Sequence, residues 1–313
     1  MQKISLASMF AFFFIQYSMT AQIANQDQKK PWLSSYQESI VSLGKIAKAD
    51  IGNNQSINYF SVVGSGMIFY VNAHNKTIPC LITAKHVLEN VPDKWTPDKI
   101  NLRLFRFQNE ELHKNLGVEI PLRKNGKKLW IEPDNKSTDL ACLPLLNLEE
   151  KLGISDLIIF PYRLFASKDD YFEGAQLFIF GYPGIVEPSF QTKALVRNGI
   201  VSWVSPSSPE SNIILVDSDL YPGNSGGPVI KVPSPMDKFG NIVVGETPKF
   251  LGIVSAKKQA PTVLIDQNGK VVLDTLGNNF FTMESVGIGI IETAHNVKIL
   301  LDKTKMLIET NKY

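Results

Sequence analysis

Residues 222–228 read Pro-Gly-Asn-Ser-Gly-Gly-Pro, and this stretch decides which fold and chemistry the rest of the chain is expected to support. Glycines on both sides of Ser225 permit a tight backbone from which the hydroxyl projects into open space. The N–H groups of Gly223 and Ser225 can then converge on one point and stabilise an oxygen that becomes negative. An ordinary glycine-rich turn is the alternative interpretation, so the motif requires partners elsewhere in the chain.

Two upstream motifs supply such partners. Residues 81–87 (LITAKHV) end an apolar run near His86, whose ring can carry a proton to and from a reacting group. Residues 137–143 (STDLACL) place Asp139 before a second apolar run, where an Asp is usually a cap or turn former. Asp139 lies between His86 and Ser225 in the sequence, and many residues separate it from each of them. These three residues are therefore the candidate catalytic residues.

The order His, Asp, Ser within TAKHV, TDLACLPL and GNSGGP resembles that of the trypsin-like serine peptidases, most closely the bacterial HtrA type without a PDZ domain. Supporting matches lie at residues 63–66, 180–184, 252–255 and 286–289, so the resemblance covers roughly residues 59–310. It implies an all-β fold of two six-stranded antiparallel β-barrels with the active site in the cleft between them. Protein or peptide substrates are then expected, and the mechanism requires no metal and no organic cofactor.

The resemblance also implies a role for each candidate. Ser225 would be the nucleophile that forms an acyl-enzyme, His86 the general base, and Asp139 the residue that orients that base. The N–H groups of Gly223 and Ser225 would form the oxyanion hole. Animal members carry an Asp directly before the nucleophile, which pairs with a newly freed amino terminus. Asn224 stands there in this chain, so activation by that ion pair is not expected.

The substrate pocket is less well determined. Ser255, Ala256 and Lys257 fall on the substrate-binding strand of the resembled family. Asp219 lies, by its spacing from the nucleophile, at the pocket-floor position that selects basic side chains in trypsin. Lys257 stands where Gly usually lines the pocket wall, and we expect it either to neutralise Asp219 or to fill the pocket. The residue preference at the cleavage site therefore stays open.

Short runs rich in Val, Ile and Phe recur from Tyr59 onward and predict many short strands without long helices between them. These runs are residues 60–63, 67–71, 80–83, 102–107, 140–143, 177–180, 213–216, 229–232 and 250–254. Such a pattern favours barrels or a sandwich. We assign residues 59–150 to the first barrel and residues 151–313 to the second barrel and a C-terminal helix.

Two helices and one turn are predicted outside this pattern. Apolar residues at three- or four-residue spacing within residues 33–48 predict an N-terminal helix, in a segment of linker and helix that spans residues 22–58. The same spacing from Ala294 to about Glu309 predicts the C-terminal helix, with Thr293 as its cap. Asn268 and Gly269 lie between two apolar runs and predict a hairpin turn.

Residues 1–21 have the features of an export signal. Lys3 precedes an apolar centre at residues 9–15, and small or polar residues lead to a predicted cleavage after Ala21. An uncleaved membrane anchor is the alternative, but residues 16–18 interrupt the apolar run well short of the roughly 20 residues that a spanning helix needs. The mature protein is therefore expected to be secreted or periplasmic, with no membrane association after cleavage.

Charge argues against one class of partner. The chain has 32 Lys and Arg against 30 Asp and Glu, which gives a net charge of +2. No long block of one sign is available to follow a phosphate backbone, so nucleic acid is not an expected partner.

The two cysteines, Cys80 and Cys142, leave two interpretations open. If His86 and Asp139 meet at the cleft, the strands beside them are neighbours, and the cysteines lie within plausible bridging range. Export makes a disulfide chemically possible, whereas two buried reduced thiols are the alternative.

Two other functions compete with a peptidase. Residues 223–227 also fit the G-x-S-x-G pattern of α/β-hydrolase esterases, but that motif requires a strand that runs directly into a helix. Residues 226–228 oppose a helix, and residues 229–232 continue as a strand. A catalytically silent binding module that keeps the barrels is the second rival. Loss of activity normally shows as replacement of a triad residue, and none is replaced here.

Overall fold

The computed structural model describes residues 32–52, 55–108, 111–146, 148, 157–187, 190–206, 213–273, 275 and 279–313. Residues Tyr36–Tyr313 form one compact unit, which is separate from the residues up to Ser35. The predicted export signal and the polar linker that follows it lie outside the described residues. Within the described ranges, no helix combines the length and the apolar character needed to cross a bilayer.

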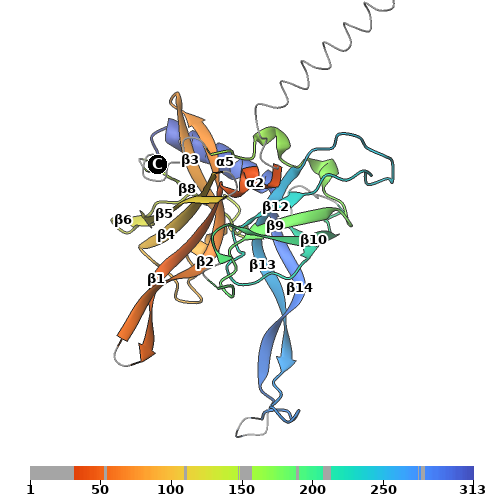
Figure 1. Cartoon of the computed structure of the whole chain (residues 1–313). Helices are drawn as coiled ribbons and strands as arrows, with labels where there is room; N and C mark the ends of the chain where they lie inside the picture. Colours follow the sequence, from red (N-terminus) through yellow and green to blue (C-terminus); the bar gives the residue numbers. More distant parts are fainter. Residues whose placement is uncertain are drawn as a thin grey trace, which may run out of the picture. The chain divides into compact units, whose positions relative to one another are not determined.

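The first six-stranded sheet has the strand order β5-β4-β1-β2-β3-β8, and all its pairings are antiparallel (Figure 1). Its strands are β1 (Ile40–Gly52), β2 (Gln55–Ala73), β3 (Lys76–Thr83), β4 (Lys99–Gln108), β5 (Glu111–Pro121) and β8 (Ala141–Pro144). A small ribbon of β6 (Arg123–Lys124) and β7 (Lys127–Lys128) lies between β5 and β8 in sequence. Among the described residues β5 and β8 do not pair with each other, so this unit is a half-barrel.

The second sheet closes into a barrel with the order β10-β11-β14-β13-β12-β9, because β9 also pairs with β10. Its strands are β9 (Gln176–Gly181), β10 (Leu195–Trp203), β11 (Ile214–Asp217), β12 (Pro228–Lys231), β13 (Lys249–Val263) and β14 (Phe281–Thr293). The short helices η1 (Tyr162–Leu164) and η2 (Lys168–Asp170) precede it. Every predicted apolar run overlaps a strand, and the expected all-β fold with two six-stranded antiparallel sheets is confirmed. Of the two barrels expected, the second is closed and the first is a half-barrel.

Residues 40–48 form a strand where the apolar spacing predicted a helix. The N-terminal helix α2 spans only Trp32–Gln37, and β1 begins at Ile40. β1 lies between β2 and β4, and its first five residues are all buried. Local spacing carried no information about these pairing partners, and tertiary contacts decided the conformation. The prediction of linker and helix over residues 22–58 is therefore wrong from Ile40 onward, and the first sheet begins there rather than at Tyr59.

The C-terminal helix α5 (Ala294–Glu309) follows β14 directly and confirms the helix predicted from its periodicity. The Thr293 side chain caps it by accepting a hydrogen bond from Asn296 N at 3.5 Å. Its buried face includes Leu300 and Leu301, and it packs on β2 and β8 of the half-barrel and on β13 and β14 of the closed barrel. The helix therefore helps to hold the two units together.

Three phenylalanines also join the two units. Phe69 of β2 lies 5.3 Å from Phe250 of β13, measured between ring centroids, and Phe165 lies 5.5 Å from Phe69 and 4.8 Å from Phe250. Ring pairs at such distances contribute beyond their area burial. Apolar packing of these rings thus holds the half-barrel against the closed barrel.

Two long hairpins extend beyond the barrels on the same side of the molecule (Figure 1). One consists of β1 and β2, and the other of β13 and β14. β13 pairs with β12 only as far as Ile253, so the described residues of β13 beyond Val254 have β14 as their one strand partner. The predicted turn at Asn268 and Gly269 lies at the far end, where Gly269 N donates to Asp266 O at 3.0 Å.

Cys80 of β3 and Cys142 of β8 are buried free thiols on neighbouring strands. Cys142 lies opposite Ile82, so the two cysteines are diagonal neighbours across the strand pair. The hydrogen bond between the two thiols, together with burial, raises the pKa of Cys80 well above its ordinary value. Of the two interpretations left open by the sequence, the structure has the reduced pair.

Candidate active site

His86 and Asp139 meet at the end of the half-barrel that faces the closed barrel. His86 lies in the short helix α3 (Lys85–Leu88), directly after β3, and Asp139 lies in the loop before β8. His86 Nδ1 is 2.7 Å from Asp139 Oδ2, and the backbone N of His86 donates to Asp139 Oδ1 at 3.0 Å. Because a carboxylate only accepts, Nδ1 carries a hydrogen, and in the neutral ring Nε2 is then an acceptor. The His86 side chain is 35% exposed, so the free ring nitrogen can be reached from solvent.

The closed barrel supplies two further contacts to Asp139. Ser255 of β13 donates its hydroxyl to Asp139 Oδ2 at 3.1 Å. Glu292 of β14 accepts a hydrogen bond from the backbone N of Asp139 at 2.9 Å through its Oε1 atom. Ser255, which the sequence assigned to the substrate-binding strand, thus contacts the acid that holds His86. Asp139 is fixed from both units of the fold.

The loop that carries Ser225 is shaped by its glycines. Gly223 and Gly226 have φ angles of +101° and +84°, in the region that side-chain-bearing residues rarely adopt. A Cβ at Gly226 would also overlap Ser65 O and Thr83 Oγ1. Ser225 is the one residue of 223–230 that is not buried, so the tight loop presents this residue at the surface.

Ser65 of β2 ties this loop to the half-barrel. Its backbone N donates to Ser225 O and its hydroxyl donates to Gly223 O, each at 2.7 Å. The same hydroxyl accepts a hydrogen bond from Tyr182 N at 2.9 Å, and Thr83 Oγ1 donates to Ser65 O at 2.6 Å. One buried serine therefore connects the loop that carries Ser225, the residue that follows β9, and β3 across the space between the two sheets.

The backbone N–H groups of the loop divide into two sets. Those of Asn224, Gly226 and Gly227 donate to Tyr221 O, Val254 O and Asn224 O, at 3.0, 2.7 and 2.9 Å. The N–H groups of Gly223 and Ser225 have no acceptor within the part of the chain that the structure describes. The two unpaired donors are the two that the motif predicts for an oxyanion hole.

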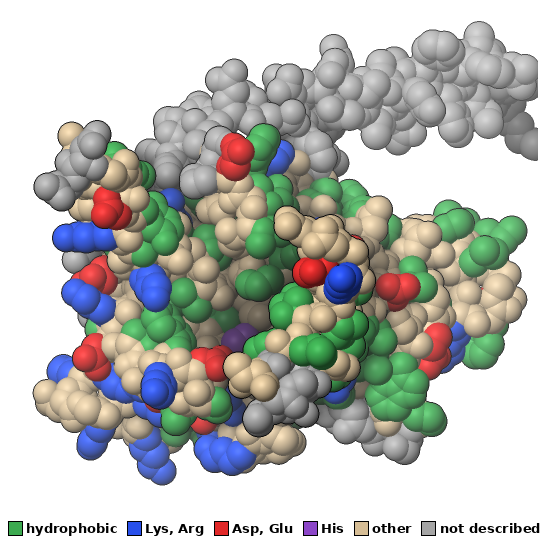
Figure 2. All heavy atoms as spheres, turned by 90° about the horizontal axis from the view of Figure 1, so that it is seen from below, with side chains coloured by type: hydrophobic (Ala, Val, Ile, Leu, Met, Phe, Trp, Pro, Cys, Tyr) green, Lys and Arg blue, Asp and Glu red, His purple; other side chains and the backbone are tan. Residues whose placement is uncertain are grey.

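Ser225 precedes β12 of the closed barrel, and His86 lies in α3 after β3 of the half-barrel. A Cβ at Gly64 would lie 2.5 Å from Val87 Cγ2 and 3.0 Å from Ser225 O, so the residue after His86 lies near the loop that carries Ser225. Among the described residues no hydrogen bond joins Ser225 Oγ to His86 Nε2. Catalytic contacts of this kind are often loose without substrate. Figure 2 shows the face on which the hairpins project, where a histidine lies inside a hollow between the surrounding side chains.

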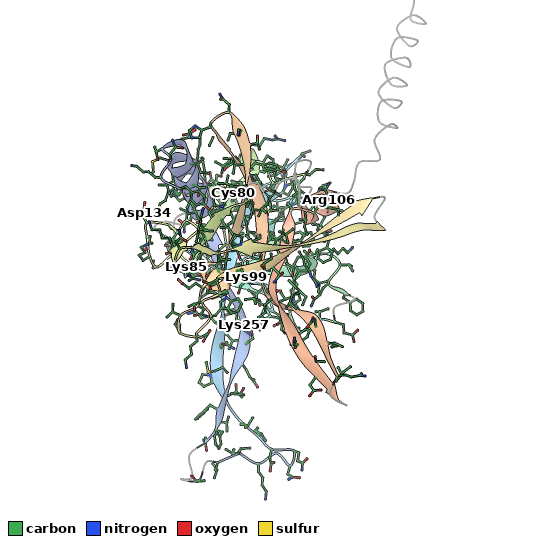
Figure 3. The ribbon with its side chains drawn as sticks, turned by 90° about the vertical axis from the view of Figure 1, so that its left-hand side faces the viewer. Cys80, Lys85, Lys99, Arg106, Asp134 and Lys257 are labelled. Carbon is green, nitrogen blue, oxygen red and sulfur yellow. The ribbon has the colours of Figure 1, made fainter. Side chains whose placement is uncertain are left out.

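Asp219 and Lys257 do not meet in the described structure. Asp219 is exposed, and its backbone O accepts hydrogen bonds from Arg197 Nε and Nη1 at 3.0 and 3.1 Å. Lys257 lies where the β13–β14 hairpin leaves the barrel (Figure 3), and no ion pair of the described residues joins it to Asp219. Leu220 is buried instead, and its Cδ1 would lie 2.5 Å from a Cβ at Gly289, the ladder partner of Lys257. An apolar side chain, and not a paired carboxylate, faces this part of the strand pair.

Cavity size alone does not locate this site. A cavity of about 1020 Å³ lies beside the small β6–β7 ribbon and the end of α5, and none of the candidate site residues lines it. Six lysines line that cavity, but two acidic groups near it, Glu132 and Asp134, pair with several of them. No group of three or more His, Cys, Asp or Glu in the described residues is arranged to hold a metal ion.

Three contact residues were missed by sequence reasoning. Ser65 was recognised only as part of a strand motif, and Glu292 and Leu220 were not singled out. Glu292 carries the clearest signal, since it is an acidic residue between an apolar run and the cap of the last helix. The partners of Ser65 and Leu220 lie far away in sequence, so neither residue has a local signal.

Comparison with known proteins identifies the family. The model of the trypsin-like peptidase domain matches residues 64–233, which is more than half of the chain and includes all three candidate catalytic residues. A crystal structure of the Rv3671c protease in its inactive form matches at 15% sequence identity over 87% of this chain and 92% of that chain, with a TM-score of 0.38. No curated protein matches. The chain belongs to the family of the trypsin-like peptidase domain.

Proposed function

We propose that this trypsin-like peptidase is a secreted serine endopeptidase in which Ser225 is the nucleophile, His86 the general base and Asp139 the residue that orients the base. The observation that carries the proposal is the double contact of Asp139 with His86, at 2.7 Å to the ring and 3.0 Å to the main chain. A carboxylate that only capped α3 would need the main-chain contact alone. The hydrogen bond to the ring is explained if Asp139 orients His86 and stabilises its charge when Nε2 accepts a proton.

The reaction follows from these positions. His86 Nε2 takes the hydroxyl proton as Ser225 Oγ attacks the carbonyl carbon of a peptide bond. The carbonyl oxygen becomes negative and accepts hydrogen bonds from the N–H groups of Gly223 and Ser225. His86 then gives its proton to the leaving amine, and an acyl group stays on Ser225. A water molecule then attacks the acyl group while His86 takes its proton, and His86 returns a proton to Ser225 Oγ as the acid product leaves.

The amino-terminal sequence supports the proposed location. Residues 1–21 have the charged flank, the apolar centre and the small residues of a cleavable signal, so we place the mature chain outside the cytoplasm. The substrates there are proteins or peptides. Sequencing the amino terminus of the exported protein tests this location, and we expect it to begin after Ala21.

Labelling with a fluorophosphonate probe tests the proposed triad. The serine hydroxyl displaces fluoride from the probe and forms a phosphonate ester, so the labelling requires no knowledge of the natural substrate. Peptide mapping then identifies the modified residue. We expect modification of Ser225 in the mature chain, and none in Ser225→Ala. A folded wild-type protein that stays unlabelled and does not cleave unfolded protein substrates would instead favour the catalytically silent binding module.

A further inference from the structure

Glu292 is a buried carboxyl group that contacts the proposed triad from the closed barrel. It is only 3% exposed and lies near the end of β14, directly before Thr293, which caps α5. Its Oε1 atom accepts from Asp139 N at 2.9 Å, and its Oε2 atom accepts from Asn296 Nδ2 at 3.2 Å. Both carboxyl oxygens are therefore held in place, one by the loop of Asp139 and one by the first turn of α5.

The contact with Asp139 N does not by itself explain why a carboxyl group stands here. A hydroxyl or an amide oxygen would accept the same N–H without placing a charge in the interior. Burial raises the pKa of Glu292 above its ordinary value, and the nearby carboxylate of Asp139 raises it further. The two hydrogen bonds and the positive charge of Lys85 oppose this rise. Asp139 and Lys85 are the charged groups that face it, so an ionised Glu292 stands beside another carboxylate at a cost in stability.

We propose that Glu292 is a positioning residue for the Asp139–His86 pair, and that its negative charge stabilises the protonated ring of His86 during the reaction. This inference rests on the proposed function. Asp139 lies in a loop, and the hydrogen bond from its backbone N anchors the residue whose carboxylate orients the ring. A second negative charge near that carboxylate, on a side chain that is itself only 3% exposed, is screened by water less than a surface charge is, so its Coulomb effect is stronger than in solvent. The ring becomes positive only as the serine attacks, and the stabilisation therefore favours the transition state over the resting enzyme.

The substitution Glu292→Gln separates the charge from the hydrogen bond. The amide oxygen still accepts from Asp139 N, and the side chain has nearly the same volume, but it carries no charge. Glu284→Gln is the matched control, because Glu284 lies on the same strand and is exposed. Glu292→Asp is the complement, since it keeps the charge and shortens the reach to Asp139 N.

Two activity measurements follow the proposed effect: the rate of fluorophosphonate labelling at Ser225 and the pH dependence of that rate. We expect Glu292→Gln to label about tenfold more slowly than wild type. The acid limb of its profile should move to lower pH by on the order of half a unit, because the protonated ring of His86 is less stabilised. Glu292→Asp should label slowly but keep the wild-type acid limb, and Glu284→Gln should match wild type in both.

Thermal unfolding at several pH values provides an independent readout. The pKa of Glu292 is raised in the folded protein, so the folded chain binds more protons than the unfolded chain above the ordinary carboxyl range. The wild type therefore loses stability as pH rises through that window, and Glu292→Gln does not. We expect the Tm of Glu292→Gln to rise relative to wild type as pH increases above the ordinary carboxyl range of about 4 to 5, while its labelling rate stays lower.

The outcomes separate this inference from the proposed function. Labelling of Glu292→Gln at the wild-type rate, with abolished labelling of Ser225→Ala, would overturn the role of Glu292 alone. Slower labelling with an unmoved acid limb would also overturn it, because a purely structural contact gives that result. If Ser225→Ala labels as well as wild type, the proposed triad itself is wrong.

Discussion

The half-barrel and the closed barrel hold their candidate catalytic residues in different ways. In the half-barrel, His86 and Asp139 are fixed by side-chain hydrogen bonds, and the carboxylate contacts both the ring and the main chain of the histidine. In the closed barrel, Ser225 is fixed by a backbone that only glycines can follow, at Gly223 and Gly226. A site held by side chains responds to changes in charge and hydrogen bonding. A site held by tight backbone is disrupted by any side chain that is added to it. Different kinds of substitution should therefore inactivate the His86–Asp139 pair and the Ser225 loop.

The largest effect is expected from a substitution that removes the reacting hydroxyl but leaves both the His86–Asp139 contacts and the glycine loop unchanged. Ser225→Ala should lower kcat/KM for an unfolded protein substrate by about 10⁴-fold or more, because binding and the oxyanion hole are all that remain. Its free energy of unfolding should change by only about 0.5 kcal/mol, since the backbone of the loop is unaltered. Kinetics and urea unfolding on the same preparation measure both quantities. Substantial residual turnover would show that another residue is the nucleophile.

Gly226→Ala should break the closed-barrel half of the comparison. The φ of +84° and the overlap of a Cβ with Ser65 O and Thr83 Oγ1 leave no room for a methyl group. We expect the free energy of unfolding to fall by about 3 kcal/mol or more, with loss of labelling at Ser225. Gly117→Ala in the half-barrel is the control, because no atom lies within 4 Å of a Cβ there. Equal stability of the two variants in urea unfolding would refute the view that backbone geometry holds Ser225 in place.

Ser65→Ala should weaken the link between the two halves. It removes the hydrogen bond to Gly223 O and leaves Tyr182 N without its acceptor. The expected loss is about 1–3 kcal/mol in the free energy of unfolding and about tenfold in labelling rate. Ser61→Ala, on the same strand, serves as control. A Ser65→Ala protein that is destabilised but labels at the wild-type rate would mean that these hydrogen bonds stabilise the fold and do not position Ser225.

The smallest expected effect concerns Lys257 of β13. Lys257 forms no ion pair with Asp219 in the described structure, and the Asp219 side chain is exposed. Lys257→Gly should therefore change the share of cleavage after Arg and Lys by less than about threefold. Profiling of both proteins on a peptide library measures this share. A tenfold shift toward basic residues would show that the two side chains do pair when substrate is bound.

The features that could be predicted from the sequence are those with local causes. The final helix with its Thr293 cap, the turn at Asn268 and Gly269, and the glycine-bounded serine loop each depend on residues close together in the chain. The strand character of β1 has no such signal, because its neighbours β2 and β4 decide it. Sequence order also brought His86 and Asp139 together as candidates, through a resemblance rather than through periodicity.

The polar contacts between the two sheets lay beyond sequence reasoning for the same physical reason. Ser65 bonds to residues about 158 positions away, and Glu292 bonds to a residue 153 positions away. No pattern in a short window encodes such a pair. Their donors and acceptors become neighbours only after apolar packing has set the two sheets against each other.

The long hairpin of β13 and β14 has a consequence for how the molecules behave in concentrated solution. A strand flanked on one side only offers free N–H and C=O groups, which can template pairing with the strand of another molecule. Leu264 N donates to Phe280 O at 2.8 Å, so the N–H group of Leu264 points toward the β14 side of the hairpin. Backbone N–H and C=O groups alternate in direction along an antiparallel strand, so those of Pro261, three residues earlier, point away from β14 toward the unpaired edge. Proline has no N–H, and Lys257 and Lys258 add positive charge where the hairpin leaves the barrel. The exposed margin of this hairpin is thereby interrupted, which disfavours sheet extension from one molecule to the next and the aggregation that would follow.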